Sequence, residues 1–131
     1  MLNVKKKKSF NFWVLVILTL IFWITHNFLA GRGEIVKNYG ISFGINGLFF
    51  IFLNIIFILF LIYFFVKKRY LELGLMIVGG LINLIDRFVF GYVRDYWWFF
   101  KVYNNLADWL IWLGIILILL KFYGKKNTNH L

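Results

Sequence analysis

The stretch GGLINLIDRFVFGYVRDYWWFFKVYNNLAD, residues 79–108, decides how the rest of this chain is interpreted. It begins inside one strongly apolar run and ends at the start of another. It nevertheless holds Asp86, Asp95 and Asp108, three of the five Asp and Glu residues in the sequence. A carboxylate in or near hydrocarbon is costly, so it needs a partner, a proton or a chemical task. This concentration of acids in so apolar a chain predicts a site.

The composition around this stretch is typical of a membrane protein. Of the 131 residues, 63% are hydrophobic and 23% aromatic, and the mean hydropathy is +0.82. A soluble domain is nearer half apolar, so a single membrane domain over residues 1–131 is expected. The absence of Cys excludes disulfides and thiolate chemistry. The net charge of +10 comes from short clusters between apolar runs. It indicates topology signals and attraction to anionic lipid, not binding of nucleic acid.

Four apolar runs are long enough to cross a bilayer, which takes about 20 residues of helix. The four lysines at residues 5–8 followed by an apolar run could form a signal peptide. The first run is long for a signal peptide and three more follow, which favours an uncleaved first helix. The sequence thus predicts an all-α membrane protein with a small β-like cradle after the first helix. The expected spans are residues 10–30, 48–66, 70–90 and 106–123, and the expected outer loops are residues 31–47 and 91–105.

The distribution of Lys and Arg predicts the orientation of these spans. Ten of the fifteen basic residues lie before the first span, in the turn at residues 67–69 or near the end of the chain. The positive-inside rule then places both termini in the cytoplasm. Residues 31–47 are rich in Gly with alternating apolar positions, which favours short strands or a curled loop outside. The aromatic run at residues 97–100 is typical of an interfacial belt.

Helix rise places the acids near the outer boundary of the membrane. Asp86 and Asp108 each lie 17 residues from the basic inner end of their span, which is about 26 Å at ~1.5 Å per residue. Both are therefore near the outer edge of a hydrocarbon core of about 30 Å. Asp95 lies beyond this edge unless the chain turns back at Gly91, which glycine permits. Depth alone therefore favours Asp86 over Asp95 as the partner of Asp108.

Polar and small residues surround these acids at helical spacing. Gly79, Asn83, Asp86 and Arg87 fall at i, i+4, i+7 and i+8, which is one face of a helix. Gly79 and its neighbour Gly80 would allow another helix to approach closely. At the start of the fourth span, residue 104 or 105 is a candidate N-cap. Such a cap would place the acid at 108 in the first turn, where the helix dipole favours negative charge.

Two carboxylates at one site suggest an acid dyad. Like charges that close cannot both ionise easily, so one carboxyl keeps a proton near neutral pH. The ionised one can then take a proton from water while the other donates to the substrate, which hydrolyses a peptide without a metal, a cofactor or a covalent intermediate. There is no HExxH motif, and His26 and His130 lie far from the acids in sequence. A serine triad has little support because no Ser lies near a His.

Four ordered blocks carry a resemblance to a known family. They read NYGISFG at 38–44, GGLINLIDR at 79–87, GYVRD at 91–95 and NLAD at 105–108. In this order and within a four-span layout, they resemble the lipoprotein signal peptidases, also called signal peptidase II. The resemblance covers most of the chain from Ala30 to Ile116.

The resemblance implies an activity and a location. The family consists of bacterial intramembrane aspartic proteases that remove signal peptides from prolipoproteins, cutting before a cysteine that bears a diacylglyceryl group. The expected partners are this diacylglyceryl-modified prolipoprotein and membrane lipid, with the protein a monomer in the bacterial inner membrane and its active site at the extracytoplasmic face. The implied catalytic residues are Asp95 and Asp108. The implied binding or supporting residues are Asn38, Gly40, Asn83, Asp86, Arg87, Asn105 and Ala107.

Departures from the family pattern keep alternatives open. The family usually has an Asp followed four residues later by Lys in the first helix, where this chain offers only Thr25, His26 and Asn27. Position 94, usually apolar, is Arg94. His26 is expected at the membrane interface, or alternatively in place of the polar group that the first helix lacks. Asp86 is expected to pair with the adjacent Arg87. One alternative is a small transporter or channel with this pair on an ion path. Another is a relative that binds lipidated peptides without cutting them.

Overall fold

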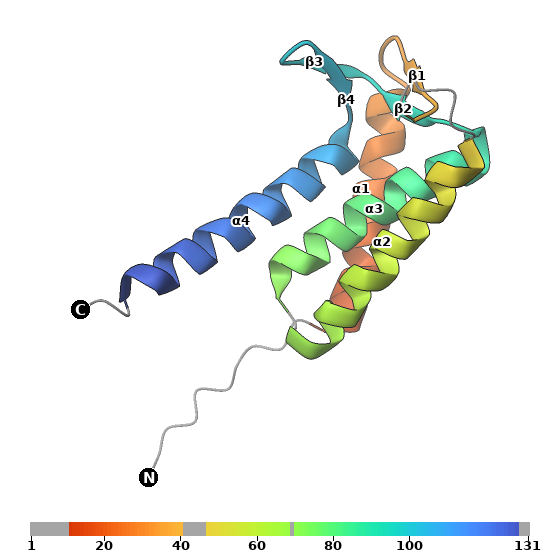
Figure 1. The fold of residues 1–131 in the computed structure, drawn as a ribbon. Helices are drawn as coiled ribbons and strands as arrows, with labels where there is room; N and C mark the ends of the chain where they lie inside the picture. Colours follow the sequence, from red (N-terminus) through yellow and green to blue (C-terminus); the bar gives the residue numbers. More distant parts are fainter. Residues whose placement is uncertain (1–10, 41–46, 69, 129–131) are drawn as a thin grey trace.

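The computed structural model describes residues 11–40, 47–68 and 70–128, and these parts of the chain are mostly helical (Figure 1). The helices are α1 (Phe12–Ala30), α2 (Gly47–Lys68), α3 (Leu71–Phe90) and α4 (Leu106–Thr128). Each contains an apolar stretch long enough to cross a membrane. The four-helix membrane class predicted from the sequence is confirmed for the described residues.

Helix α3 occupies the centre of the fold, where it packs against each of the other three helices (Figure 1). Its residues 73–80 are all buried, whereas α1, α2 and α4 leave large apolar side chains exposed along most of their length. Apolar side chains on the outside of membrane helices face lipid. The polar residues of α3 therefore lie inside the protein, where other elements supply their partners.

Glycines allow α4 and α2 to approach α3 closely. A Cβ atom at Gly79 would lie 2.4 Å from the carbonyl oxygen of Ala107, so only glycine fits there. A Cβ atom at Gly80 would lie 3.1 Å from the side chain of Ile58 on α2. The helix contacts predicted at both glycines are confirmed. Because Ala107 directly precedes Asp108, the contact at Gly79 also sets the position of that acid.

The turn at Gly91 returns the chain toward the helices. Gly91 has φ +80°, a left-handed conformation, and its N–H donates to the carbonyl of Arg87, so α3 ends at Phe90. Strand β2 (Val93–Asp95) follows at once and pairs antiparallel with β1 (Val36–Asn38). The end expected for the third span at residue 90 is confirmed, and β1 lies within the loop for which short strands were expected.

A second two-stranded sheet, the hairpin of β3 (Trp97–Phe99) and β4 (Val102–Asn104), precedes α4. Its two turn residues, Phe100 and Lys101, have φ angles of 48° and 61°, which fits a type I′ turn. From the sequence, this segment was expected to be only an exposed aromatic loop. The strands were missed because such turns are usually marked by Asn-Gly, which is absent here. Both two-stranded sheets lie at one end of the helices (Figure 1).

Candidate active site

Asp108 is fixed at the start of α4 by a reciprocal cap. Its backbone N–H donates to Oδ1 of Asn105 at 3.0 Å, and its Oδ2 accepts the backbone N–H of Asn105 at 3.2 Å. This arrangement is a capping box, and the amino end of a helix favours a negative charge. Asn105 is therefore the N-cap, as one of the two candidates predicted. The remaining oxygen, Oδ1 of Asp108, accepts from Nδ2 of Asn83 on α3 at 2.9 Å.

Asp95 is held at the end of β2 by two amides. Its Oδ1 accepts from Nδ2 of Asn105 at 2.8 Å, and its Oδ2 accepts from Nδ2 of Asn38 at 3.0 Å. The backbone N–H of Gly40 donates to Oδ1 of Asn38 at 2.9 Å, which fixes the direction of that amide. Gly40 has φ +102°, and a Cβ atom there would lie 2.5 Å from the ring of Phe50. The segment that follows α1 thus reaches Asp95 through a glycine-dependent turn.

The two carboxylates belong to one hydrogen-bonded chain. Nδ2 of Asn105 donates to Oδ1 of Asn83 at 3.2 Å as well as to Asp95, and Asn83 donates in turn to Asp108. Among the described residues, neither carboxylate has a cationic side chain within 4.0 Å. The charge of Arg87 is felt by both acids, and its Nη1 donates to the carbonyl of Asn83 at 3.4 Å. The two acids therefore share amide partners and one nearby positive charge.

Burial raises the pKa of Asp95 to about 6. The hydrogen bonds from Asn38 and Asn105 and the charge of Arg87 oppose this rise, whereas the negative charge of Asp108 adds to it. A carboxyl with such a pKa, beside a second carboxyl, can hold a proton much closer to neutral pH than an ordinary aspartate. The geometry and charge at Asp95 thus suit an acid dyad.

Asp86 lies apart from this pair, in a separate cluster where both of its carboxylate oxygens accept hydrogen bonds. Its side chain is 0% exposed. Arg94 binds it bidentately, from Nη2 to Oδ1 at 2.7 Å and from Nε to Oδ2 at 3.1 Å, and also donates its backbone N–H. Nε2 of His26 lies 2.9 Å from Oδ2. The predicted pairing of Asp86 with Arg87 is wrong, because adjacent residues on a helix point in different directions.

His26 and Arg94 are buried and Tyr96 is half-buried, and none of the three was assigned to the interior from the sequence. His26 was expected at the membrane interface, but it is 0% exposed and lies between Asp86 and Tyr96. Arg94 also donates from Nη2 to Oδ1 of Asn27 at 2.8 Å. The sequence did contain a signal. His26 and Arg94 both depart from the family pattern, and basic side chains in a chain with buried acids indicate that they pair with one of those acids.

Asp108 and Asn38 open on a cavity of about 550 Å³. The β3–β4 hairpin and the first turns of α4 form its walls, which are mostly aromatic. An apolar wall beside a carboxylate suits a substrate that has both a lipid-like part and a polar bond. The other lining residues are Phe99, Phe100, Val102, Tyr103, Asn104, Trp109, Trp112 and Ile116.

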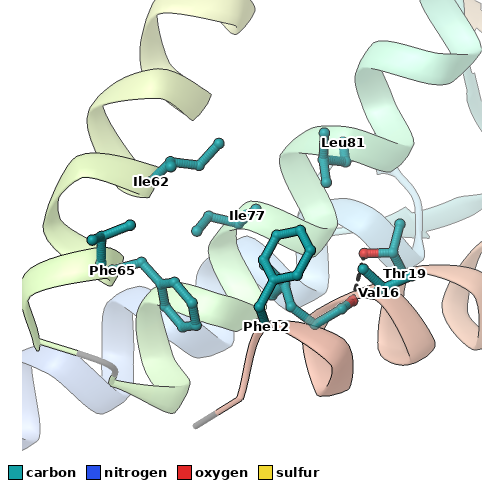
Figure 2. A pocket seen from close by; sticks show the side chains of 9 residues that line it. Phe12, Val16, Thr19, Ile62, Phe65, Ile77 and Leu81 are labelled. Carbon is teal, nitrogen blue, oxygen red and sulfur yellow. Dashed lines mark hydrogen bonds between the residues drawn. The ribbon is translucent and has the colours of Figure 1, made fainter. Parts of the chain in front are cut away.

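A second cavity, of about 330 Å³, lies between α1, α2 and α3 (Figure 2). Its lining is apolar except for Thr19, whose hydroxyl donates to the carbonyl of Leu15. Among the described residues, no titratable side chain lines this cavity. Within the described residues, no group of three or more His, Asp or Glu side chains is placed to hold a metal ion.

The predicted site residues thus do not all lie together. Most of them meet around the two amide-held acids, Asp86 belongs to the separate cluster, and Arg87 lies near enough to act electrostatically on all three acids. Ala107 is buried and packs its carbonyl against Gly79. The set around the amide-held acids consists of Asn38, Gly40, Asn83, Asp95, Asn105 and Asp108.

These features define a small membrane protein with two amide-held carboxylates at one end of four potential spans. The family model described as Signal peptidase (SPase) II matches residues 11–123. The chain belongs to the signal peptidase II family, as its four sequence blocks predicted, and is thus a multi-pass bacterial membrane protein of a protease family.

Individual relatives agree over nearly the whole chain. The lipoprotein signal peptidase of Bartonella quintana is 37% identical, over 94% of this chain and 95% of the relative. That of Campylobacter jejuni (strain 81116) is 31% identical, over 94% of each. A solved bacterial membrane enzyme, determined by the in meso method, superimposes with a TM-score of 0.73 at 22% identity, over 92% of this chain and 93% of that one. The last likeness supports the fold.

Proposed function

We propose that this protein is an aspartic endopeptidase that removes signal peptides from diacylglyceryl-modified prolipoproteins, cutting before the lipidated cysteine. One observation carries the proposal: Asp95 and Asp108 are joined through Asn105 and Asn83 and have no cationic side chain within 4.0 Å among the described residues. A salt-bridged carboxylate resists protonation, whereas a dyad needs one proton between its two carboxyls.

The proposed reaction uses the pair as a unit. The ionised carboxylate takes a proton from a water molecule, whose oxygen attacks the carbonyl carbon of the scissile peptide bond. The protonated carboxyl gives its proton to the carbonyl oxygen. When the tetrahedral intermediate collapses, the C–N bond breaks and the leaving nitrogen takes the proton that the first carboxylate accepted from water. The second carboxylate takes back the proton of the former carbonyl oxygen, so the pair again holds one proton. The positive charge of Arg87 and the nearby amides favour the charge that develops on the oxygen.

The location of the pair suits a substrate anchored in lipid. Lys67, Lys68, Lys125 and Lys126 lie at the ends of α2 and α4 away from the acids. The positive-inside rule then places these lysines in the cytoplasm and the acids at the extracytoplasmic face of the inner membrane. The lipid tails could stay in the bilayer while the scissile bond reaches the aromatic cavity beside Asp108. We propose that one copy of the chain suffices, since both acids come from the same chain.

The ion-path alternative has less support. It requires Asp86 to be reachable, but this side chain is fully buried and its oxygens are bonded to Arg94 and His26. The non-cleaving relative remains distinct, because it would bind lipidated peptide and leave it intact.

The test is a cleavage assay on diacylglyceryl-modified prolipoprotein in phospholipid vesicles. Wild type is compared with Asp95→Asn and Asp108→Asn. Each substitution removes an acid or base step, so the rate should fall by about 10³-fold or more. Glu72→Gln, at the opposite end of α3, is the matched carboxyl-to-amide control and should cleave normally. Full cleavage by Asp108→Asn would end the proposal, and binding without cleavage by wild type would establish the non-cleaving relative.

A further inference from the structure

A second polar network holds the back of the strand that carries Asp95. Side chains alternate along an extended strand, so Arg94 and Tyr96 point away from the face that carries Asp95. Arg94 is bound to Asp86 on α3. The Tyr96 hydroxyl accepts the backbone N–H of Leu106, the first residue of α4, at 3.1 Å. Both neighbours of Asp95 are therefore tied to helices.

His26 on α1 connects these two interactions, because it contacts both Asp86 and Tyr96. Its Nε2 lies 2.9 Å from Oδ2 of Asp86, and its Nδ1 lies 3.0 Å from the hydroxyl of Tyr96. The carboxylate of Asp86 can only accept, so the hydrogen at that contact is on Nε2 of His26. Three elements that are distant in sequence thus meet at one buried imidazole.

Whether Nδ1, the other ring nitrogen of His26, carries a hydrogen depends on the donors around it. Burial raises the pKa of Tyr96 to about 12, so its hydroxyl keeps its proton at neutral pH. The hydroxyl oxygen already accepts from Leu106, and Nδ1 of His26 is the acceptor at hydrogen-bond distance for its proton. A hydrogen on Nδ1 would leave the proton of this half-buried hydroxyl without an acceptor among the described residues, which costs free energy.

We propose that His26 is a positioning residue, which as a neutral imidazole with its hydrogen on Nε2 fixes the strand of Asp95 and the start of α4 relative to each other. The inference rests on the proposed function, because it assigns His26 to the geometry of the Asp95–Asp108 pair. Tyr96 directly follows Asp95, and Leu106 lies two residues before Asp108, so loss of the link would let the two acids move apart.

The tautomer is tested first, by a measurement that does not depend on activity. The chain has two histidines, so His130→Gln in a protein labelled with ¹⁵N-histidine leaves the signals of His26 alone. In detergent micelles at neutral pH, nitrogen NMR should show one ring nitrogen with hydrogen, Nε2, and one without. Tyr96→Phe should shift the Nδ1 signal and leave Nε2 bonded. A hydrogen on Nδ1, or on both nitrogens, would overturn the proposal.

The positioning role is tested by kinetics. His26→Gln keeps a donor for Asp86 but loses the bond to Tyr96, whereas Tyr96→Phe loses both that bond and the bond from the backbone N–H of Leu106. Each should lower kcat by about 10- to 100-fold, since misplacement of reacting groups by about 1 Å can have this effect. KM should change less than twofold, because the cavity beside Asp108 is untouched. The double variant should resemble Tyr96→Phe, because that single variant already lacks the bond that His26→Gln removes.

Tyr123→Phe, on the exposed end of α4, is the matched control and should keep wild-type kcat. A kcat unchanged in both single variants, a loss confined to KM, or effects that multiply in the double variant would each overturn the positioning role. If wild type itself cleaves nothing, the proposed function fails, while the NMR measurement still decides the tautomer.

Discussion

Asp86 and Asp95 lie nine residues apart and are both almost completely buried, yet their surroundings differ in kind. Asp86 is bound by a guanidinium and an imidazole, while Asp95 is bound by the amides of Asn38 and Asn105. Cations fix a carboxylate in its ionised form, whereas neutral amides position it and leave protonation within reach. Because both acids are buried, burial does not distinguish the structural carboxylate from the proposed catalytic one. The hydrogen-bond donors do: they include a cationic guanidinium at Asp86 and are neutral at Asp95.

The largest expected effect is on the free energy of unfolding, which should fall in Asp86→Asn but not in Asp95→Asn. Asp86→Asn leaves the buried guanidinium of Arg94 without its counter-charge, and breaking a buried ion pair in this way costs about 3–5 kcal/mol. Asp95→Asn removes a buried charge that has no cation within 4.0 Å among the described residues, so stability should stay the same or rise. The free energy of unfolding is measured in mixed micelles titrated with SDS. An Asp86→Asn protein as stable as Asp95→Asn would remove the distinction.

Sequence reasoning predicted the local part of this arrangement. The end of α3 at Gly91, the close contact at Gly79 and the cap at residue 105 each follow from residue types within one or two helical turns. Asp95 needed more, because a straight-helix depth estimate favoured Asp86, and only the resemblance to a family corrected it. The chain's reversal at Gly91 is the physical reason that the estimate failed.

The long-range pairs could not be predicted from spacing. Arg94 binds Asp86 only because β2 folds back on the end of α3, and His26 reaches the same acid across 60 residues of sequence. The pairing of Asp86 with Arg87 was predicted because the two residues are adjacent in sequence. Adjacent side chains on a helix point in different directions, so they do not face each other. The β3–β4 hairpin was hidden because its turn uses Phe100 and Lys101 where glycine is usual.

A smaller effect is expected on the pH dependence of kcat/KM, because the Asp95–Asp108 pair must hold one proton. The pKa of Asp95 is raised to about 6, so below this pH the carboxyl holds its proton, and above it the proton is lost. The proposed mechanism needs one proton on the pair. The value of kcat/KM, which reports the free enzyme, should therefore fall as pH rises above about 6, approaching tenfold per pH unit.

Asn38→Ala sharpens this pH prediction. The hydrogen bond from Asn38 stabilises the ionised form of Asp95 and lowers its pKa, so its removal should move the alkaline limb to higher pH. The pH profiles of the two proteins are compared on one substrate at constant ionic strength. A limb that stays in place, or moves to lower pH, would contradict the role given to this amide.

The smallest effect contrasts the buried ion pair of Asp86 with an exposed one. Glu72 on α3 pairs with Lys121 on α4 at 3.2 Å, but the lysine side chain is 44% exposed. Water screens such a pair, so Glu72→Gln should lower the free energy of unfolding by less than about 1 kcal/mol. Lys121→Gln and the double variant complete a cycle that isolates the pair from the contact between the lysine and the ring of Tyr70. A coupling energy as large as the loss in Asp86→Asn would mean that burial does not distinguish the two pairs.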